Sequence, residues 1–207
     1  MKLATRFLLA PIAAALLMAS ATSTAGVLKS RLSVDNGYVM YLSSSDSLAG
    51  TMVDSGNDWT TTYQDNNVLA VGTSYFLHIY AYDQGGIAGL LGEFNITGGN
   101  HVFSNGLSTL TTNTTNWKGN NTGFNGSYSA VNSLGLDGVG PWGNRPNIVN
   151  SATWIWAGDA HAQDKAYFTT KITAVQQSAA VPEPTTVALL GLGLLGLAAA
   201  RRRRTAK

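Results

Sequence analysis

The sequence predicts an all-β protein, an antiparallel β-sandwich or jelly roll, flanked by an N-terminal signal peptide and a C-terminal short hydrophobic helix. Three observations predict the sandwich, which we place at residues 26–180. Short segments rich in β-branched and aromatic residues recur along this region, and clusters of Gly, Asn, Asp and Ser separate them. No apolar stripe with the 3.6-residue period of a helix runs through it. A region of this length buries enough surface to form one domain with its own core.

Residues 1–25 have the three parts of a secretory signal peptide. Lys2 and Arg6 supply a basic start, and an apolar segment and a run of small residues follow. This order is typical of a leader that is removed during export. Cleavage after Ala25 and cleavage after Ala21 both satisfy the preference for small residues, so the sequence leaves both sites open.

The strand candidates share a high content of β-branched and aromatic residues. The five strongest are residues 38–42, 74–82, 90–96, 152–156 and 166–172. Turn residues, which are rich in Gly, Asn and Asp, occupy positions 35–37, 55–58, 83–86 and 98–100. The polar stretch at 104–137 predicts either long surface loops or short edge strands. Short strands separated in this way favour an antiparallel sandwich.

The charge of the chain is distributed unevenly. The whole chain has a formal net charge of +2, but residues 26–180 carry six basic and ten acidic side chains, a net charge of −4. An acidic domain without a stripe of Lys and Arg lacks the cationic surface that nucleic acids require, so we expect no nucleic-acid partner. The chain has no cysteine, so no disulfide stabilises the domain after export and its stability depends on the core.

Residues 181–207 combine a proline motif, an apolar run and a basic cluster. The motif and the cluster consist of Pro182, Glu183, Pro184, Arg201, Arg202, Arg203 and Arg204. The apolar run at 187–200 would span about 21 Å as a helix, which is less than the roughly 30 Å of a bilayer core. It is therefore a marginal transmembrane helix. The arginines would hold their end on the cytoplasmic side and leave the preceding residues outside.

This tail resembles the PEP-CTERM sorting signal of Gram-negative bacteria that make exopolysaccharide. The resemblance covers residues 181–204. It implies that a membrane-embedded exosortase recognises the Pro-Glu-Pro motif and detaches the tail after transient anchoring in the inner membrane. The mature protein would then reach the cell surface, outer envelope or extracellular matrix, either shed or attached. The resemblance concerns location and not activity.

A second resemblance covers most of residues 34–172. The motifs that carry it are residues 35–41, Trp59, residues 80–93, 117–118, 140–143 and 154–156. This ordered series looks like the galactose-binding-domain-like jelly rolls that accompany bacterial polysaccharide-degrading enzymes. The resemblance implies sugar binding through loops at one end of the sandwich, sometimes with a structural calcium ion. This chain differs because no catalytic domain is attached to it.

The candidate ligand-binding residues lie in turn-rich segments. Trp59 and Trp142 are flanked by turn residues, so we expect their rings to be exposed as platforms for sugar rings. Arg145 lies close to Trp142 and would donate paired hydrogen bonds to hydroxyls, or else form a surface ion pair with an aspartate. Asp83 and Gln84 either present polar groups to a ligand or only form a turn.

Other residues are assigned to the core or to a possible metal site. Trp154 and Trp156 alternate along one strand and share a face, so we expect at least one of them to be buried. A calcium site would need oxygen ligands such as Asp35, Asp83 or Glu93 to converge. The sequence has no EF-hand spacing, so we predict no metal ligands and no cofactor.

The sequence contains no catalytic signature among the common hydrolase and nucleotide motifs. Residues 191–196 match Gly-x-Gly-x-x-Gly, but they lie in the tail and not in a βαβ unit. We therefore expect a non-enzymatic protein that binds carbohydrate weakly. Two alternatives stay open, which are a structural matrix protein without a specific ligand and a small glycan hydrolase.

Overall fold

The structure is a computed structural model that describes residues 24–176 and 184–204. The strands form one compact unit, and the C-terminal helix belongs to another. Residues 1–23 of the predicted signal peptide lie outside the described residues.

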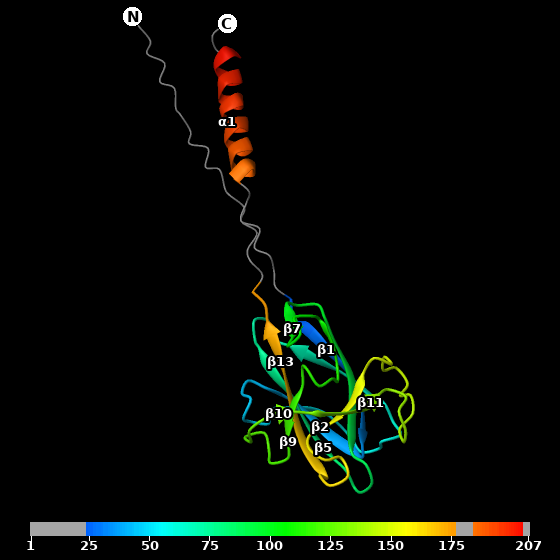
Figure 1. Ribbon diagram of the computed structural model, residues 1–207. Helices are drawn as coiled ribbons and strands as arrows, with labels where there is room; N and C mark the ends of the chain where they lie inside the picture. The colour runs from blue at the N-terminus through cyan, green and yellow to red at the C-terminus, as the bar shows by residue number, and fades with distance from the viewer. Residues whose placement is uncertain (1–23, 177–183, 205–207) are drawn as a thin grey trace, which may run out of the picture. The chain divides into compact units, whose positions relative to one another are not determined.

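The strands form two antiparallel sheets (Figure 1). Sheet A contains β1 (Gly26–Asp35), β4 (Tyr63–Leu69), β6 (Gly89–Thr97), β8 (Thr109–Thr111), β11 (Asn132–Leu136) and β12 (Thr153–Trp156). Sheet B contains β2 (Gly37–Ser43), β3 (Thr51–Gly56), β5 (Tyr75–Tyr82), β7 (His101–Phe103), β9 (Lys118–Asn120), β10 (Ser129–Ala130) and β13 (Lys165–Ala174). The chain passes repeatedly from one sheet to the other, as from β1 to β2 and from β5 to β6. The predicted β-sandwich is therefore confirmed.

The main core lies between the two sheets. In β1, Leu28 and Leu32 are fully buried, whereas Lys29 and Arg31 between them are exposed. This alternation follows from the two-residue period of a strand. Side chains from both sheets meet in the same apolar cluster. Among its members are Leu28, Leu32, Leu90, Phe94, Trp156, Met40, Leu77, Ile79 and Phe168.

A second apolar cluster lies on the other side of sheet A. On β6, Leu90 belongs to the main core and the next residue, Leu91, belongs to this second cluster. Neighbouring residues of a strand point to opposite faces, so the second cluster covers the outer face of sheet A. Its buried members are Leu91, Trp142, Ile148, Ala152 and Trp154. Most of them come from the segment 137–152 between β11 and β12, which we call the cover segment.

All five segments predicted as strands overlap observed strands, and the predicted turns lie at or between the ends of strands. The polar stretch at 104–137 contains both of the alternatives, because loops join the short strands β8, β9, β10 and β11 there. Trp154 and Trp156 are both fully buried, but they belong to different apolar clusters. The two indoles therefore pack in different places, and the predicted burial of at least one of them is confirmed.

Candidate functional site

The structure brings three of the five predicted ligand-binding residues together at one end of sheet A. Arg145 in the cover segment donates a hydrogen bond from Nη1 to the carbonyl oxygen of Trp59 at 3.1 Å, and one from Nη2 to the carbonyl oxygen of Trp142. Its guanidinium carbon also lies 5.8 Å from the centre of the Trp59 ring. The backbone N–H of Arg145 donates to Asp137 Oδ1 at 2.9 Å. Arg145 therefore holds loops together, and neither predicted use of its side chain is what the contacts show.

Trp142 is buried, so its predicted exposure is wrong. The side chain is 2% exposed, and its ring stacks on Trp154 with the centroids 4.3 Å apart and the planes at 18°. Its Nε1–H donates to Asp35 Oδ2 at 2.8 Å. A Cβ atom at Gly89 would lie 2.9 Å from atoms of both tryptophan rings, so only glycine leaves room for this pair above β6. The neighbouring Pro141 and Gly143 suggested an open turn, but the turn folds back onto the sheet.

Asp83 and Gln84 differ in their surroundings. Asp83 is 9% exposed, and its Oδ1 has no hydrogen-bond partner within the described residues. Gln84 is exposed, and its backbone N–H donates to Asn36 Oδ1 at 2.5 Å. Of the two, only Gln84 is available to a ligand in solution.

Asp35 connects Asp83 to the cover segment electrostatically. Burial raises the pKa of the Asp35 carboxyl, and the hydrogen bond from Trp142 opposes this. The negative charge of Asp83 raises the pKa further, whereas the positive charge of Arg145 lowers it. Asp35, Asp83, Trp142 and Arg145 therefore form one interacting group at this end of the sandwich.

Glu93 does not join the other two carboxylates that were considered for calcium. It lies on β6 and accepts hydrogen bonds from Arg31 Nη1 at 3.2 Å and from the N–H of Val149 at 3.0 Å. Asp35 pairs with Gly89, which is four residues or about 13 Å further along β6. Among the described residues, no group of three or more His, Asp or Glu side chains is placed to hold a metal ion.

A shallow cleft of about 360 Å³ lies beside Glu93 on sheet A. Its other lining residues are Asn105, Leu107, Thr109, Leu110, Thr111, Asn113, Val149 and Ser151. The side chains of Asn105 and Asn113 bond to backbone groups of their own loops. The amides in this cleft therefore support the loops that form it.

Sheet B has an aromatic surface that the sequence analysis missed. Tyr80 and Tyr82 on β5 and Tyr167 on β13 point away from the core, and each is partly exposed. We call these three residues the tyrosine row. The Tyr80 ring centre lies 5.0 Å from that of Tyr167 and 5.9 Å from that of Tyr82, with the planes tilted by 31° and 33°. None of the three hydroxyls forms a hydrogen bond with another described residue.

A glycine lies under one ring of the tyrosine row. Gly37 on β2 pairs with Tyr82 on β5. A Cβ atom at Gly37 would lie 2.5 Å from the Tyr82 hydroxyl oxygen and 2.6 Å from the ring carbon that carries it. The Tyr82 ring therefore lies across Gly37 and along the sheet. The alternating pattern of aromatic residues at 80 and 82 was the signal that would have identified this surface.

The tyrosine row ends where a loop covers the sheet. Phe124 stacks on His78 with the ring centres 4.8 Å apart and the planes at 12°. The same ring contacts Tyr167 and Tyr41 edge-on, at 5.0 Å and 5.5 Å between centres. His78 is 0% exposed as a result. The aromatic residues on this half of the face therefore pack against one another.

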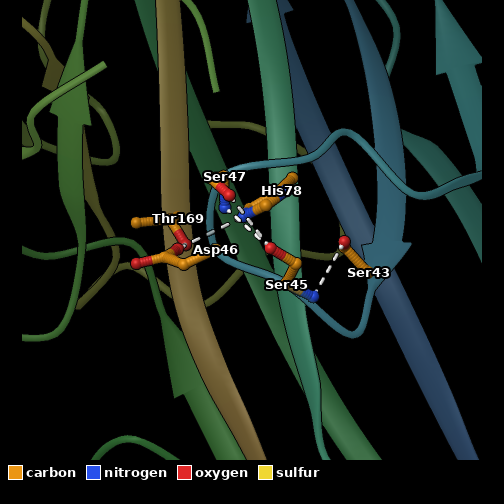
Figure 2. A network of polar contacts seen from close by, with 6 residues as sticks. All are labelled: Ser43, Ser45, Asp46, Ser47, His78 and Thr169. Atoms are coloured by element: carbon orange, nitrogen blue, oxygen red, sulfur yellow. Dashed lines mark hydrogen bonds and ion pairs between the residues drawn. The ribbon is translucent and has the colours of Figure 1, made fainter. Parts of the chain in front are cut away.

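A polar network fixes a second loop over the same half of sheet B. Figure 2 shows Asp46 between β13 and β5, with Oδ1 accepting a hydrogen bond from Thr169 Oγ1 at 2.6 Å and lying 3.3 Å from His78 Nε2. Serine residues on both sides of Asp46 bond to one another and shape its loop. The network closes the face beside the tyrosine row and leaves the row itself open.

The C-terminal unit contains α1 (Pro184–Arg204). The helix begins at the second proline of the predicted motif. Proline is well suited to the first helical position because it lacks an N–H, and an N–H there would have no partner within the helix. Pro182 and Glu183 lie outside the described residues. The arginines from Arg201 onward form the last turn, where positive charges interact favourably with the helix dipole. Among the described residues, no helix is long and apolar enough to cross a membrane, which leaves the expected transmembrane helix without support.

Comparison with known families identifies the tail. A model of the PEP-CTERM protein-sorting motif matches residues 180–204. The motif implies an exported protein that is processed by exosortase, which is a membrane enzyme. No curated protein and no solved structure matches the chain. The comparisons thus establish the sorting of the protein and are silent about the sandwich.

Proposed function

We propose that the sandwich is a non-catalytic protein of the cell surface or extracellular matrix that binds carbohydrate weakly. The sorting motif supports the export step. In this proposal the tail is anchored transiently in the inner membrane, exosortase removes it, and the sandwich reaches the outer envelope or the matrix, where exopolysaccharide is the available ligand.

The observation that carries the carbohydrate proposal is the tyrosine row. A sugar has an apolar face of C–H groups and a rim of hydroxyls, and a tyrosine offers an apolar ring with a polar tip. Tyr80, Tyr82 and Tyr167 present both properties, because their rings are partly exposed and their hydroxyls form no hydrogen bond with the residues that the structure describes. An open face encloses little of a ligand, so each contact contributes little and binding is weak.

The loop end of the sandwich supports the proposal less well. Trp142 is buried, and Nη1 and Nη2 of Arg145 donate hydrogen bonds to backbone carbonyl oxygens. Among the five predicted residues, Gln84 is exposed, and Trp59 and Arg145 are partly exposed. We therefore assign the sugar contacts to sheet B, and not to the loops that the galactose-binding-domain-like resemblance implies.

A glycan-binding screen tests this function against the structural alternative. Protein purified from the producing cells is screened at millimolar sugar concentrations, and Tyr80→Ala is compared with Val68→Ala, which removes an apolar side chain that is 70% exposed on β4. We expect a signal that Tyr80→Ala abolishes and Val68→Ala retains. A complete lack of sugar-dependent signal would leave the structural matrix role. Turnover of the exopolysaccharide would instead favour a hydrolase.

Deletion of residues 181–207 tests the sorting step separately. We expect the shortened protein to escape processing and to be lost from the surface. Mass spectrometry of the protein from the culture fluid and the envelope measures both ends of the mature chain. Unchanged processing and surface retention would contradict a role for the tail.

A further inference from the structure

We infer that the tyrosine row binds the middle of an extended, neutral polysaccharide strand, which crosses β2, β5 and β13 over several sugar units. This inference rests on the proposed function and specifies the form of its ligand. It excludes the end of a polysaccharide and a free monosaccharide as the preferred ligand.

The first argument is the arrangement of the rings. Val39 on β2, Tyr80 on β5 and Tyr167 on β13 are direct neighbours across the sheet, and Gly37, Tyr82 and Lys165 form the next row. Adjacent β-strands lie about 4.8 Å apart, and outward-facing residues on one β-strand repeat about every 6.6 Å. The Tyr80 ring contacts the Tyr82 ring and the Tyr167 ring at tilts of 33° and 31°, so the three rings form one continuous row with Tyr80 in the middle. Such a surface is extended and offers several adjacent contacts.

The second argument is the direction that the surface leaves open. Phe124 stands beside the row and contacts Tyr167 and Tyr41 edge-on. A polysaccharide that ran along β5 toward His78 would meet the Phe124 ring, because Phe124 is stacked on His78. A polysaccharide that crosses β5 passes alongside Phe124 instead. The tip of the Tyr82 side chain lies over Gly37 on β2, so this side chain extends in the direction of the proposed path.

The third argument is energetic. Association carries a free-energy cost because the two molecules lose translational and rotational freedom. One sugar on one partly exposed ring cannot offset that cost. A polysaccharide that contacts several rings incurs the same cost only once. Further contacts along the same strand form at a high effective concentration. The affinity should therefore rise steeply with chain length.

The fourth argument is charge. Residues 26–180 carry a net charge of −4, so an anionic polymer is repelled by the domain as a whole. Lys165 is the exposed charged residue that pairs with Tyr82 at the margin of the row, and a single lysine does not reverse this balance. A neutral strand has no such penalty.

The experiment measures retardation of the mature protein, purified from the producing cells, in native gels that contain a soluble neutral glucan, mannan or galactan, or the anionic polymer alginate. Competition with matched monosaccharides and hexasaccharides gives the dependence on chain length. We expect at least one neutral polymer to retard the protein. The hexasaccharide should compete at least tenfold better than the monosaccharide, and alginate should not retard the protein.

Two substitutions separate ring stacking from general apolar contact. Tyr80→Phe keeps the ring and should retain most of the binding, whereas Tyr80→Leu and Tyr82→Leu keep an apolar side chain and should each weaken binding at least tenfold. Trp59→Leu at the loop end is the matched control and should bind as the unchanged protein does. Thermal unfolding of each variant shows whether it is folded, and Tyr82→Leu is the second variant if Tyr80→Leu does not fold.

The outcomes distinguish the inference from the function on which it rests. Binding that is equally strong for monosaccharide and polymer, or that Trp59→Leu removes and the tyrosine-to-leucine variants retain, would overturn the inference and leave carbohydrate binding in place. A lack of binding to every glycan would overturn both. Sedimentation that shows a dimer dispersed by the tyrosine-to-leucine substitutions would identify a second copy of the chain as the occupant of the row and overturn the glycan assignment.

Discussion

The two outer faces of the sandwich differ in what covers their aromatic residues. On sheet A, the cover segment buries Trp142 against Trp154, and Asp35 accepts the indole hydrogen bond. On sheet B, Phe124 and the Asp46 loop cover only half of the face, and the tyrosine row stays partly exposed. Whether an aromatic residue acts in packing or in recognition thus depends on the segment that folds over it and on the partners left for its polar atoms.

Removal of Trp142 should have the largest effect on this contrast. Trp142→Ala deletes a fully packed indole and leaves Asp35 without its donor, so we expect a loss of about 3–5 kcal/mol in the free energy of unfolding. Urea denaturation measures it. Tyr167→Ala, which removes an aromatic ring from the other face, is the matched control and should cost less than half as much. Equal losses would show that the two faces do not differ in packing.

Substitution of Arg145 should have the next largest effect. Arg145→Lys keeps the charge but loses the planar group that bonds to two carbonyl oxygens and lies over Trp59. We expect a loss of about 1–3 kcal/mol in the free energy of unfolding, because buried carbonyl groups lose a partner.

Arg31→Lys provides the control for Arg145. Arg31 is paired with Glu93 at 3.2 Å, and its side chain is 44% exposed. An exposed pair of this kind contributes at most about 1 kcal/mol. If the two substitutions destabilise the protein equally, Arg145 does not hold the cover segment in place.

The sequence predicted the strands better than it predicted the surface. Residues 74–82 and 166–172 are predictable as strands because β-branched and aromatic content is a local property of the sequence. β1 was missed although Leu28 and Leu32 alternate with Lys29 and Arg31, because it has few aromatic residues. The burial of Trp142 was not predictable locally, since it depends on Gly89, which is remote in the sequence and provides the space for the indole.

Substitution in the tyrosine row should separate binding from stability. Tyr82→Leu removes one ring contact, with Tyr80, and keeps an apolar side chain over Gly37. An aromatic pair is worth about 0.5–1.5 kcal/mol beyond its buried area, so the free energy of unfolding should fall by no more than this. The same variant is expected to lose polymer binding. A large loss of stability would place Tyr82 with the packing residues and remove the distinction between the two faces.

The smallest expected effect is a pH dependence at the carboxylate that anchors the cover segment. Burial raises the pKa of Asp35, so the folded protein keeps this proton at a pH where the unfolded chain, with a pKa of about 3.9, has released it. The folded state then binds more protons, and its free energy of unfolding falls as the pH rises from about 4 through the raised pKa. Asp35→Asn keeps an oxygen acceptor for Trp142 and removes this contribution.

Urea unfolding from pH 4 to pH 7 measures that slope. Asp54 controls for position, because burial also raises the pKa of its carboxyl, which accepts a hydrogen bond from the Tyr38 hydroxyl at 2.5 Å. Each asparagine variant should remove one part of the slope, and the two parts should add because the carboxylates have different partners. Only Asp35→Asn should also change the near-ultraviolet signal of the stacked indoles Trp142 and Trp154 with pH. If Asp54→Asn changes that signal equally, the carboxylate of Asp35 is not specific to the cover segment, and the two faces respond to pH as one structure.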